Sequence, residues 1–286
     1  MMLIPILEQV LNGLLAGAYY LLIALGLSLI FSLGGLVNLA HGAFYALGAY
    51  FAVKLADHIG FAGAFVLSPI LVALIGLLVE RFLFRRFYRE DPALGLLLTF
   101  GLAMVAEQTL RLVFGAAPLP FSIPDALKGQ VLVGDFIYSR YRLAMLGVAV
   151  AAVAGLWYLL QRTPFGRVVR AGVQNPDMVA ALGISLTRYM SGVVGISVAL
   201  AGLAGVMAAP IYQVNPLMGA DTIIVVFAVV VIGGMGSIMG AVVTGFGLGI
   251  IEGLTKVFYP EASNTVIFVI MAIVLMIRPQ GLFGSR

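Results

Sequence analysis

TPFGRVVRAGVQNPDMVAALGISLTR, residues 163–188, is the longest polar interruption with helical character in an otherwise apolar chain. Thr163-Pro164 predicts a helix start, because the N–H that proline lacks would have no intrahelical partner in a first turn. Asn175-Pro176-Asp177 predicts a second short helix, Met178 to Leu182, which Gly183 ends. Such a stretch is either a docking site for a soluble partner or a cytoplasmic loop whose positive charges only set membrane orientation, and its pattern leaves both interpretations open.

The composition of the 286 residues is that of an integral membrane protein. Hydrophobic residues make up 62% and charged residues 10%, and the mean hydropathy is +1.13. Soluble proteins carry about 25% charged residues, so this chain has too few to cover a soluble surface. The net charge of +4 therefore does not indicate nucleic-acid binding, since basic residues in short loops set membrane orientation. The absence of cysteine excludes disulfides and thiolate metal sites.

The first residues, MMLIPILEQ, lack the positive region of a cleavable signal peptide, so we expect the first span to serve as its own insertion signal.

Apolar segments long enough to cross about 30 Å of hydrocarbon recur along the chain. They lie at 9–33, 36–56, 61–84, 92–114, 141–160, 189–210 and 262–278. A further apolar block, 217–256, is too long for one span, and Gly233-Gly234-Met235-Gly236-Ser237 divides it into two. The sequence therefore predicts an all-α, polytopic integral membrane protein with about eight to nine transmembrane helices.

Three groups of arginines fall on one side of the membrane if the 217–256 block crosses twice. They are Arg81, Arg85, Arg86 and Arg89; Arg162, Arg167, Arg170 and Arg188; and Arg278 with Arg286. The positive-inside rule places that side in the cytoplasm, with the N-terminus outside and the C-terminus inside. The outer loop, 115–140, contains an apolar patch at 131–133 that predicts a short hairpin or surface helix. No soluble domain fits in it, so we expect residues 1–286 to form a single transmembrane domain whose cytoplasmic loop is 161–188.

Two Gly-Gly turns share a pattern. The first is SLGGLVN at 32–38, and the second is the GGMGS at 233–237; in each, a small polar residue follows the glycine pair by three positions and an apolar helix comes next. Both turns are expected on the cytoplasmic side, which indicates two halves repeated in one orientation, and such Gly-interrupted segments point to a transport pathway. Small residues at every fourth position, in 241–253 and again at Gly13 and Gly17, predict helices that approach each other closely.

The sequence contains none of the common motifs for nucleotide binding, nucleophilic catalysis or metal-dependent hydrolysis. It has no Walker A loop, no G-x-S-x-G elbow and no HExxH, and its two histidines are too far apart to predict a metal site. We therefore expect neither an enzyme nor a metal centre.

Few polar residues lie at membrane depth, and Asn38, His41 and Gly42 are the strongest candidates for a pathway. Asn38 and His41 follow a helix break and share one face, and Gly42 permits close backbone approach. A satisfied hydrogen bond between helices would explain both polar residues equally well. Glu107 with Arg111, and Glu252 with Lys256, are one turn apart and predict local ion pairs.

Four motifs together resemble the inner-membrane permease subunits of branched-chain amino-acid ABC importers. They are GLSLIFSLGGLVNLAHGAFYALGAY at 26–50, TPFGRVVRAGVQNPDMVAALGI at 163–184, VVVIGGMGSIMGA at 229–241 and RPQGLFG at 278–284. The resemblance covers essentially the whole chain, in order, and is to the shorter, purely transmembrane one of the two permeases that such systems usually contain.

The resemblance implies a multi-pass protein of the bacterial inner (cell) membrane. A periplasmic solute-binding protein would deliver the solute to this chain and a second homologous permease, and two ATP-binding subunits would drive alternating access. No cofactor is implied in this chain, since the partner subunits bind ATP; the other partner is membrane lipid, and no nucleic acid is implied. The resemblance assigns coupling to the ATPase to Gly166, Arg167, Arg170, Asn175, Asp177 and Gly183. It assigns the translocation pathway or its gate to Asn38, His41, Gly42, Gly233, Gly234, Gly236 and Ser237.

The resemblance leaves the solute open. Ala43 stands where many members carry an acidic residue, and related permeases also move urea, short amides and aromatic acids. A self-contained solute channel or facilitator would share the Gly-Gly repeat, but it would have no reason for a structured loop at 163–188. A secondary transporter for small amides or urea would need an essential carboxylate such as Glu107 or Glu252.

Overall fold

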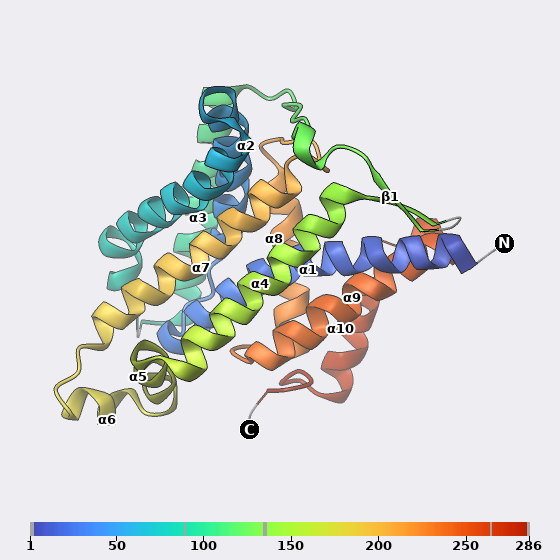
Figure 1. Cartoon of the computed structure of the whole chain (residues 1–286). Helices are drawn as coiled ribbons and strands as arrows, with labels where there is room; N and C mark the ends of the chain where they lie inside the picture. Colours follow the sequence, from blue (N-terminus) through green and yellow to red (C-terminus); the bar gives the residue numbers. More distant parts are fainter. Residues whose placement is uncertain (1–2, 89, 134–135, 264, 285–286) are drawn as a thin grey trace.

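The structure, a computed structural model, describes residues 3–88, 90–133, 136–263 and 265–284. Within these ranges the chain is helical apart from one short β-hairpin, as predicted for an all-α membrane protein (Figure 1). In chain order the elements are α1 (Leu3–Gly34), α2 (His41–Phe82), η1 (Phe84–Arg86), α3 (Pro92–Phe114), η2 (Asp125–Leu127), β1 (Gln130–Val133), β2 (Phe136–Ser139), α4 (Arg140–Arg162), α5 (Pro164–Gln174), α6 (Pro176–Ala181), α7 (Leu186–Ala208), α8 (Met218–Gly233), α9 (Ile238–Phe258), η3 (Pro260–Ala262) and α10 (Val266–Ile277).

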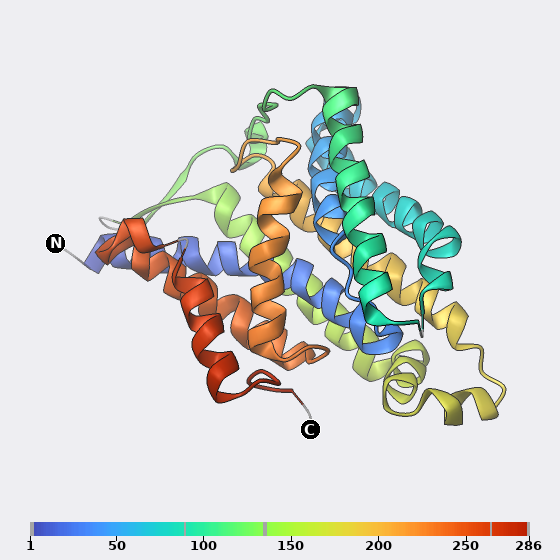
Figure 2. The same cartoon turned by 180° about the vertical axis from the view of Figure 1, so that it is seen from behind.

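α1 forms the centre of the bundle and packs against α7 and α9 (Figures 1 and 2). Small residues make the contact with α9 possible: a Cβ added to Gly249 would lie 2.2 Å from the carbonyl oxygen of Gly13, closer than two atoms can approach. In lipid the hydrophobic effect does not drive helices together, so the van der Waals contacts that such a close backbone approach permits stabilise the helix pair instead. The predicted close approach of the small residues in 241–253 and at Gly13 and Gly17 is confirmed.

α2 consists of two helical segments that meet at Gly60. Its φ of 71° and ψ of 171° interrupt the helix, a backbone conformation that glycine adopts without steric cost. The predicted break between the segments 36–56 and 61–84 is thus present at Gly60, while the crossing of the membrane by each segment stays a prediction. The first segment, however, begins at His41 and not at residue 36, because residues 35–40 are irregular.

The apolar block 217–256 divides into α8 and α9 at the second Gly-Gly turn, as predicted. Gly234 and Gly236 have φ of 97° and 86°, in the left-handed region that favours glycine. Within the described part of the chain, six helices are long and apolar enough to cross a membrane by length and composition, while α8 and α10 are shorter. α10, expected at 262–278, has 12 residues, about 18 Å of helix, and begins only at Val266, four residues after the 3₁₀ turn η3 ends at Ala262. The number of crossings therefore stays a prediction.

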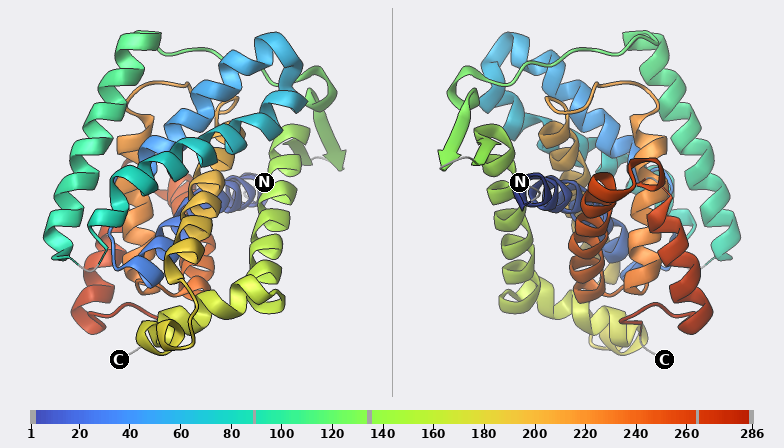
Figure 3. Two further views of the ribbon diagram at one scale, coloured as in Figure 1. Left: turned by 90° about the vertical axis from the view of Figure 1, so that its left-hand side faces the viewer. Right: turned by 90° about the vertical axis from the view of Figure 1, so that its right-hand side faces the viewer.

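The predicted arginine groups lie at helix ends and in the segments between them. Arg81 is in the last turn of α2 and Arg85 and Arg86 are in η1; Arg162 ends α4, Arg167 and Arg170 are in α5 and Arg188 is in the first turn of α7; Arg278 follows α10. The α5–α6 segment and the chain after α10 lie at the lower end in Figures 1 and 3. Arg89 and Arg286 fall outside the described residues. We call this the α5–α6 end. At the opposite end, which we call the hairpin end, β1 and β2 pair antiparallel from Gln130↔Ser139 to Val133↔Phe136, which confirms the predicted hairpin.

Candidate functional site

The polar stretch 163–188 folds into two short capped helices, as its sequence predicts. The hydroxyl oxygen of Thr163 accepts a hydrogen bond from Gly166 N at 3.2 Å, and the side-chain oxygen of Asn175 accepts one from Met178 N at 2.9 Å. Each such cap stabilises its helix by about 1 kcal/mol. Gly183, with φ of 76°, ends the second helix. The segment thus has a defined shape of its own.

α4 and α5 meet at an elbow formed by Leu160, Gly166 and Arg170. A Cβ on Gly166 would lie 2.1 Å from the carbonyl oxygen of Leu160, so only glycine fits there without a shift of the backbone. The Arg170 guanidinium donates to that carbonyl at 2.6 Å and to the side-chain oxygen of Gln161. Its positive charge also complements the negative end of the α4 dipole. Arg170 therefore holds the elbow, a contact that sequence analysis missed.

The side of α5 and α6 that faces away from the bundle is exposed and mixed in character. Of the residues assigned to coupling, Arg167, Asn175, Asp177 and Gly183 are exposed, whereas Gly166 is buried in the elbow. Two large apolar side chains of the α6 segment are also exposed there: Met178 at 59% and Leu182 at 71%. We call these two residues the apolar patch. Exposed apolar groups rimmed by polar ones are typical of an interaction site, and sequence analysis missed them although Met178 and Leu182 are one turn apart.

A cavity of about 180 Å³ separates α5 from the two Gly-Gly turns. Val169, Arg170 and Val173 line it from α5, and Ser32 and Gly236 line it from the turns. Ser32 Oγ lies 3.1 Å from the carbonyl oxygen of Gly236, so the two turns that share a sequence pattern also touch in space. The structure thus brings α5 and both turns to one place.

The C-terminal segment 278–284, which we call the tail, closes the second Gly-Gly turn. Its backbone amides at Leu282 and Phe283 donate to the carbonyls of Ile232 and Gly233 at 2.8 and 3.1 Å. These carbonyls belong to the last turn of α8, which has no intrahelical donors for them. The resemblance motif RPQGLFG therefore acts in this structure as a cap supplied from another part of the chain.

Asn38 and His41 are fully buried, and among the described residues their side-chain polar atoms have no hydrogen-bond partner. The backbone on either side of Asn38 is fixed by Thr99 of α3, whose hydroxyl accepts from Leu39 N at 3.2 Å and can donate to the carbonyl of Val37 at 3.1 Å. For Asn38, the hydrogen bond between helices that would have explained the side chain is thus absent from the described part of the chain, whereas the backbone of Ile23 on α1 lies within reach of the His41 ring. An unpaired buried polar group costs about 1–3 kcal/mol, so their place at 0% exposure calls for a function or a bound water.

Gly42 packs directly on α8. A Cβ there would lie 2.2 Å from the carbonyl oxygen of Gly219, so the two backbones are in contact, as the interpretation of Gly42 as a site of close approach requires. Ser237 caps α9 by accepting a hydrogen bond from Gly240 N at 3.0 Å. Asn38, His41 and Gly42 are thus grouped at the start of α2, apart from the second turn. Whether either group lies on a translocation pathway stays a prediction.

A buried carboxylate that sequence analysis missed lies near the α5–α6 end. Glu80 of α2 is 1% exposed, pairs with Arg85 at 2.9 Å and accepts a hydrogen bond from Ser191 of α7 at 3.0 Å. Arg85 also donates to Ser191 at 2.7 Å, which closes a network between η1 and the start of α7. Burial, and the charge of Glu80, raise the pKa of the neighbouring Tyr88 phenol above its usual range. Sequence analysis treated Arg85 only as a marker of membrane side.

Both ion pairs predicted from helix spacing are present. Arg111 donates to Glu107 at 3.0 Å, and Lys256 donates to Glu252 at 2.6 Å. Tyr20 of α1 also donates to Glu252, at 3.1 Å. Among the described residues, no group of three or more His, Asp or Glu side chains lies close enough to hold a metal ion.

Comparison with known proteins gives the family. Residues 9–275 match the family described as "Branched-chain amino acid transport system / permease component". The chain is 28% identical to the high-affinity branched-chain amino acid transport system permease protein LivH of Salmonella typhimurium, over 97% of this chain and 95% of that protein. It is 29% identical to the corresponding protein BraD of Pseudomonas aeruginosa, with the same coverage. It is also 29% identical to the permease protein LivM of Salmonella typhimurium, over 92% of this chain but 67% of LivM.

The coverage shows that this chain corresponds in length to LivH, the shorter of the two Salmonella relatives. A transport permease family is not an enzyme family, and the long apolar helices are those of a multi-pass membrane protein. The chain belongs to the branched-chain amino acid transport system permease family.

Proposed function

We propose that this chain is one transmembrane subunit of an ATP-driven importer for branched-chain or related amino acids in the bacterial inner membrane. The family supports the amino-acid permease, and the α5–α6 segment carries the proposal of ATP coupling. Two capped helices, joined to α4 at the elbow and presenting the apolar patch of Met178 and Leu182, form a surface suited to a soluble partner. That partner is the pair of ATP-binding subunits, which bind the ATP; this chain needs no cofactor of its own.

The coupling would work through displacement of α5. The elbow at Gly166 and Arg170 joins α5 to α4, and the cavity beside α5 leaves space between it and the two Gly-Gly turns. A pull on the apolar patch would move α5 relative to Ser32 and Gly236 and change the contact between the turns. Alternating access would follow if Gly233, Gly234, Gly236 and Ser237 form part of the gate, with Asn38, His41 and Gly42 nearer the solute.

A second permease and a periplasmic solute-binding protein complete the proposal. Salmonella typhimurium has two differently named permease proteins, LivH and LivM, that both match this chain. Two homologous permeases in one organism support a pair of permeases in the working importer. A binding protein on the outer side would supply most of the affinity for the solute.

Copurification tests the assembly directly. The chain is purified from its native membrane in mild detergent, and its partners are identified by mass spectrometry. Recovery of an ATP-binding subunit and a second permease supports the proposal, whereas recovery of this chain alone would favour a facilitator.

The apolar patch provides a sharper test with a matched control. Leu182→Asp is expected to lose the ATP-binding subunit, because a carboxylate would be buried unpaired in the contact. Leu132→Asp changes a leucine of similar exposure, 68% against 71%, at the hairpin end, and should retain that subunit. Equal recovery of the ATP-binding subunit from both variants would contradict docking at the patch.

A further inference from the structure

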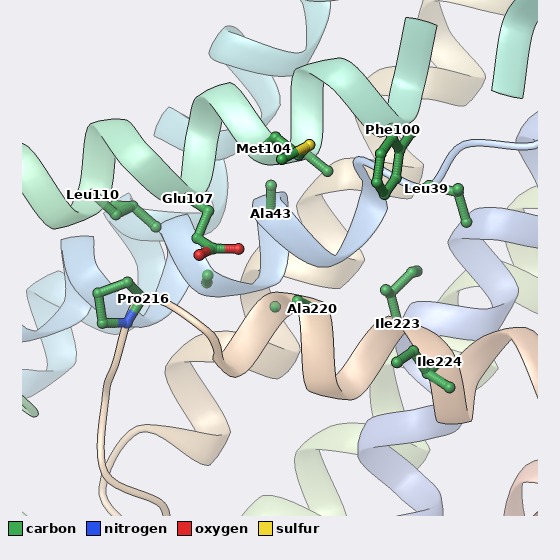
Figure 4. A pocket seen from close by; sticks show the side chains of 13 residues that line it. Leu39, Ala43, Phe100, Met104, Glu107, Leu110, Pro216, Ala220, Ile223 and Ile224 are labelled. Atoms are coloured by element: carbon green, nitrogen blue, oxygen red, sulfur yellow. The ribbon is translucent and has the colours of Figure 1, made fainter. Parts of the chain in front are cut away.

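A second cavity, of about 230 Å³, lies between α2, α3 and α8. Its walls are small or aliphatic over most of their extent, with Phe100 and Met104 on the α3 side. Figure 4 shows the Glu107 carboxylate directed from α3 into the space toward Ala43 and Ala220. Glu107 is the single ionisable residue that lines this cavity.

The Glu107 carboxylate at this cavity belongs to an ion pair. Arg111, one turn further along α3, donates to Glu107 Oε1 at 3.0 Å. Among the described residues the other carboxylate oxygen accepts no hydrogen bond, and Arg111 Nε is buried without a partner. The cavity thus presents one free acceptor, on Glu107, while Arg111 contacts that carboxylate from outside the cavity and keeps a positive charge one turn away.

The shape and charge together match one class of solute. A zwitterionic amino acid presents an ammonium and a carboxylate on neighbouring atoms, and both need a partner of opposite charge when they leave water. Resting on the function proposed above, we propose that this cavity binds the aliphatic amino acid that is transported. The Glu107 carboxylate receives its ammonium, the positive charge of Arg111 beside the cavity balances its carboxylate, and the branched side chain occupies the space beside Ala43 and Ala220.

The apolar walls would set the specificity. Small-molecule sites usually have about 300–1,000 Å³, so a smaller cavity suits a compact solute. A hydroxyl or amide side chain would find no hydrogen-bond partner against Ile223 and Met104, so serine or asparagine would bind poorly. An uncharged solute such as urea would leave the ion pair unused. Glu107 lies about two turns before α3 ends at Phe114, on the predicted outer side, where a solute would arrive first.

The test measures binding of [³H]L-leucine to the complete importer in nanodiscs, without the solute-binding protein and without ATP. The competitors are 3-methylbutylamine, which lacks the carboxylate, and 4-methylpentanoate, which lacks the ammonium. We expect leucine to compete better than either by at least about ten-fold, the factor of one charge-assisted hydrogen bond. Equal competition by 4-methylpentanoate would overturn the role of Glu107.

Two variants and a control separate recognition from folding. Glu107→Gln should weaken leucine binding at least about ten-fold. Ala220→Leu keeps the ion pair and fills the space, so it should weaken binding by a similar factor even if Glu107→Gln fails to assemble. Thr109→Leu adds a side chain of the same size on an exposed face of α3, and binding should stay within about two-fold of the wild type.

The outcomes distinguish this inference from the proposed function. If the wild-type importer takes up leucine with ATP but Glu107→Gln and Ala220→Leu bind it normally, the cavity is not the site. Lipid retained in the cavity, unaffected by leucine, would likewise overturn it. If the wild type neither binds nor transports any aliphatic amino acid, the proposed function fails.

Discussion

Arg170→Glu tests whether the elbow between α4 and α5 transmits motion. The guanidinium donates to the carbonyl of Leu160 and to Gln161. A hydrogen bond to a charged group contributes about 1.5–3 kcal/mol, and partial exposure places this one near the lower value. A carboxylate at the negative end of α4 would add a repulsion of about 0.3–1 kcal/mol. The total is about 2 kcal/mol. It would shift the equilibrium between an elbow with α5 held against the end of α4 and one with α5 released about thirty-fold toward the released form.

The assay compares transport with ATP hydrolysis in the reconstituted importer. We expect Arg170→Glu to insert and assemble normally but to lose uptake, while ATP hydrolysis continues. Arg167→Glu is the matched comparison on the proposed docking surface: it makes the same charge change on the same helix, at an exposed residue outside the elbow. Loss of ATP-subunit binding in Arg167→Glu, with normal transport in Arg170→Glu, would show that charge at the docking surface matters and that the elbow does not.

Three further predictions concern contacts elsewhere in the bundle. Asn38→Leu removes an unpaired buried amide, so assembly should be unharmed while transport falls; reduced expression with normal specific transport would make Asn38 a packing residue. Arg85→Met should lower the thermal stability of the detergent-solubilised protein more than Glu80→Gln, because it leaves a charge that is 1% exposed without its partner, a loss of about 3–5 kcal/mol. The reverse order of stability would contradict the unpaired buried carboxylate as the cause of the loss. Gly281→Ala places a Cβ 2.5 Å from Gly234 N at a φ of 81°, so the tail should detach and the amide of Leu282 should lose protection from hydrogen exchange; unchanged protection would contradict the tail as a cap of α8.

Local features of this fold could be predicted because their causes are local. A proline after a capping side chain starts α5 at Thr163 and α6 at Asn175, and a glycine with positive φ ends α6. Residues one turn apart on a helix meet, so Glu107 and Arg111 could be paired from spacing alone. Each of these inferences needs only a few neighbouring residues.

Contacts between distant parts of the chain left no comparable signal. Glu80 and Ser191 are separated by 111 residues, and Ser32 and Gly236 by 204, so no periodicity connects them. Arg85 was interpretable as a charge that sets orientation, yet its partner is a carboxylate hidden in an apolar helix. The helix start at His41 could not be predicted for a similar reason. Thr99, on α3, forms hydrogen bonds with the backbone N–H of Leu39 and the backbone carbonyl of Val37, so these groups need no helical partners and the segment before His41 can stay irregular.

The arrangement at the α5–α6 end favours a driven permease over a self-contained channel. A channel needs a pore, but it has no need of a capped pair of helices with apolar side chains turned away from the bundle. Movement of those helices could reach the second Gly-Gly turn, because Ser32 and Gly236 form both a wall of the cavity beside α5 and the contact between the two turns. The tail holds the α8 side of that turn through backbone hydrogen bonds. Because Gly234 and Gly236 have no side chain to resist a change in φ, displacement of α5 would be taken up at this turn before the rest of the bundle.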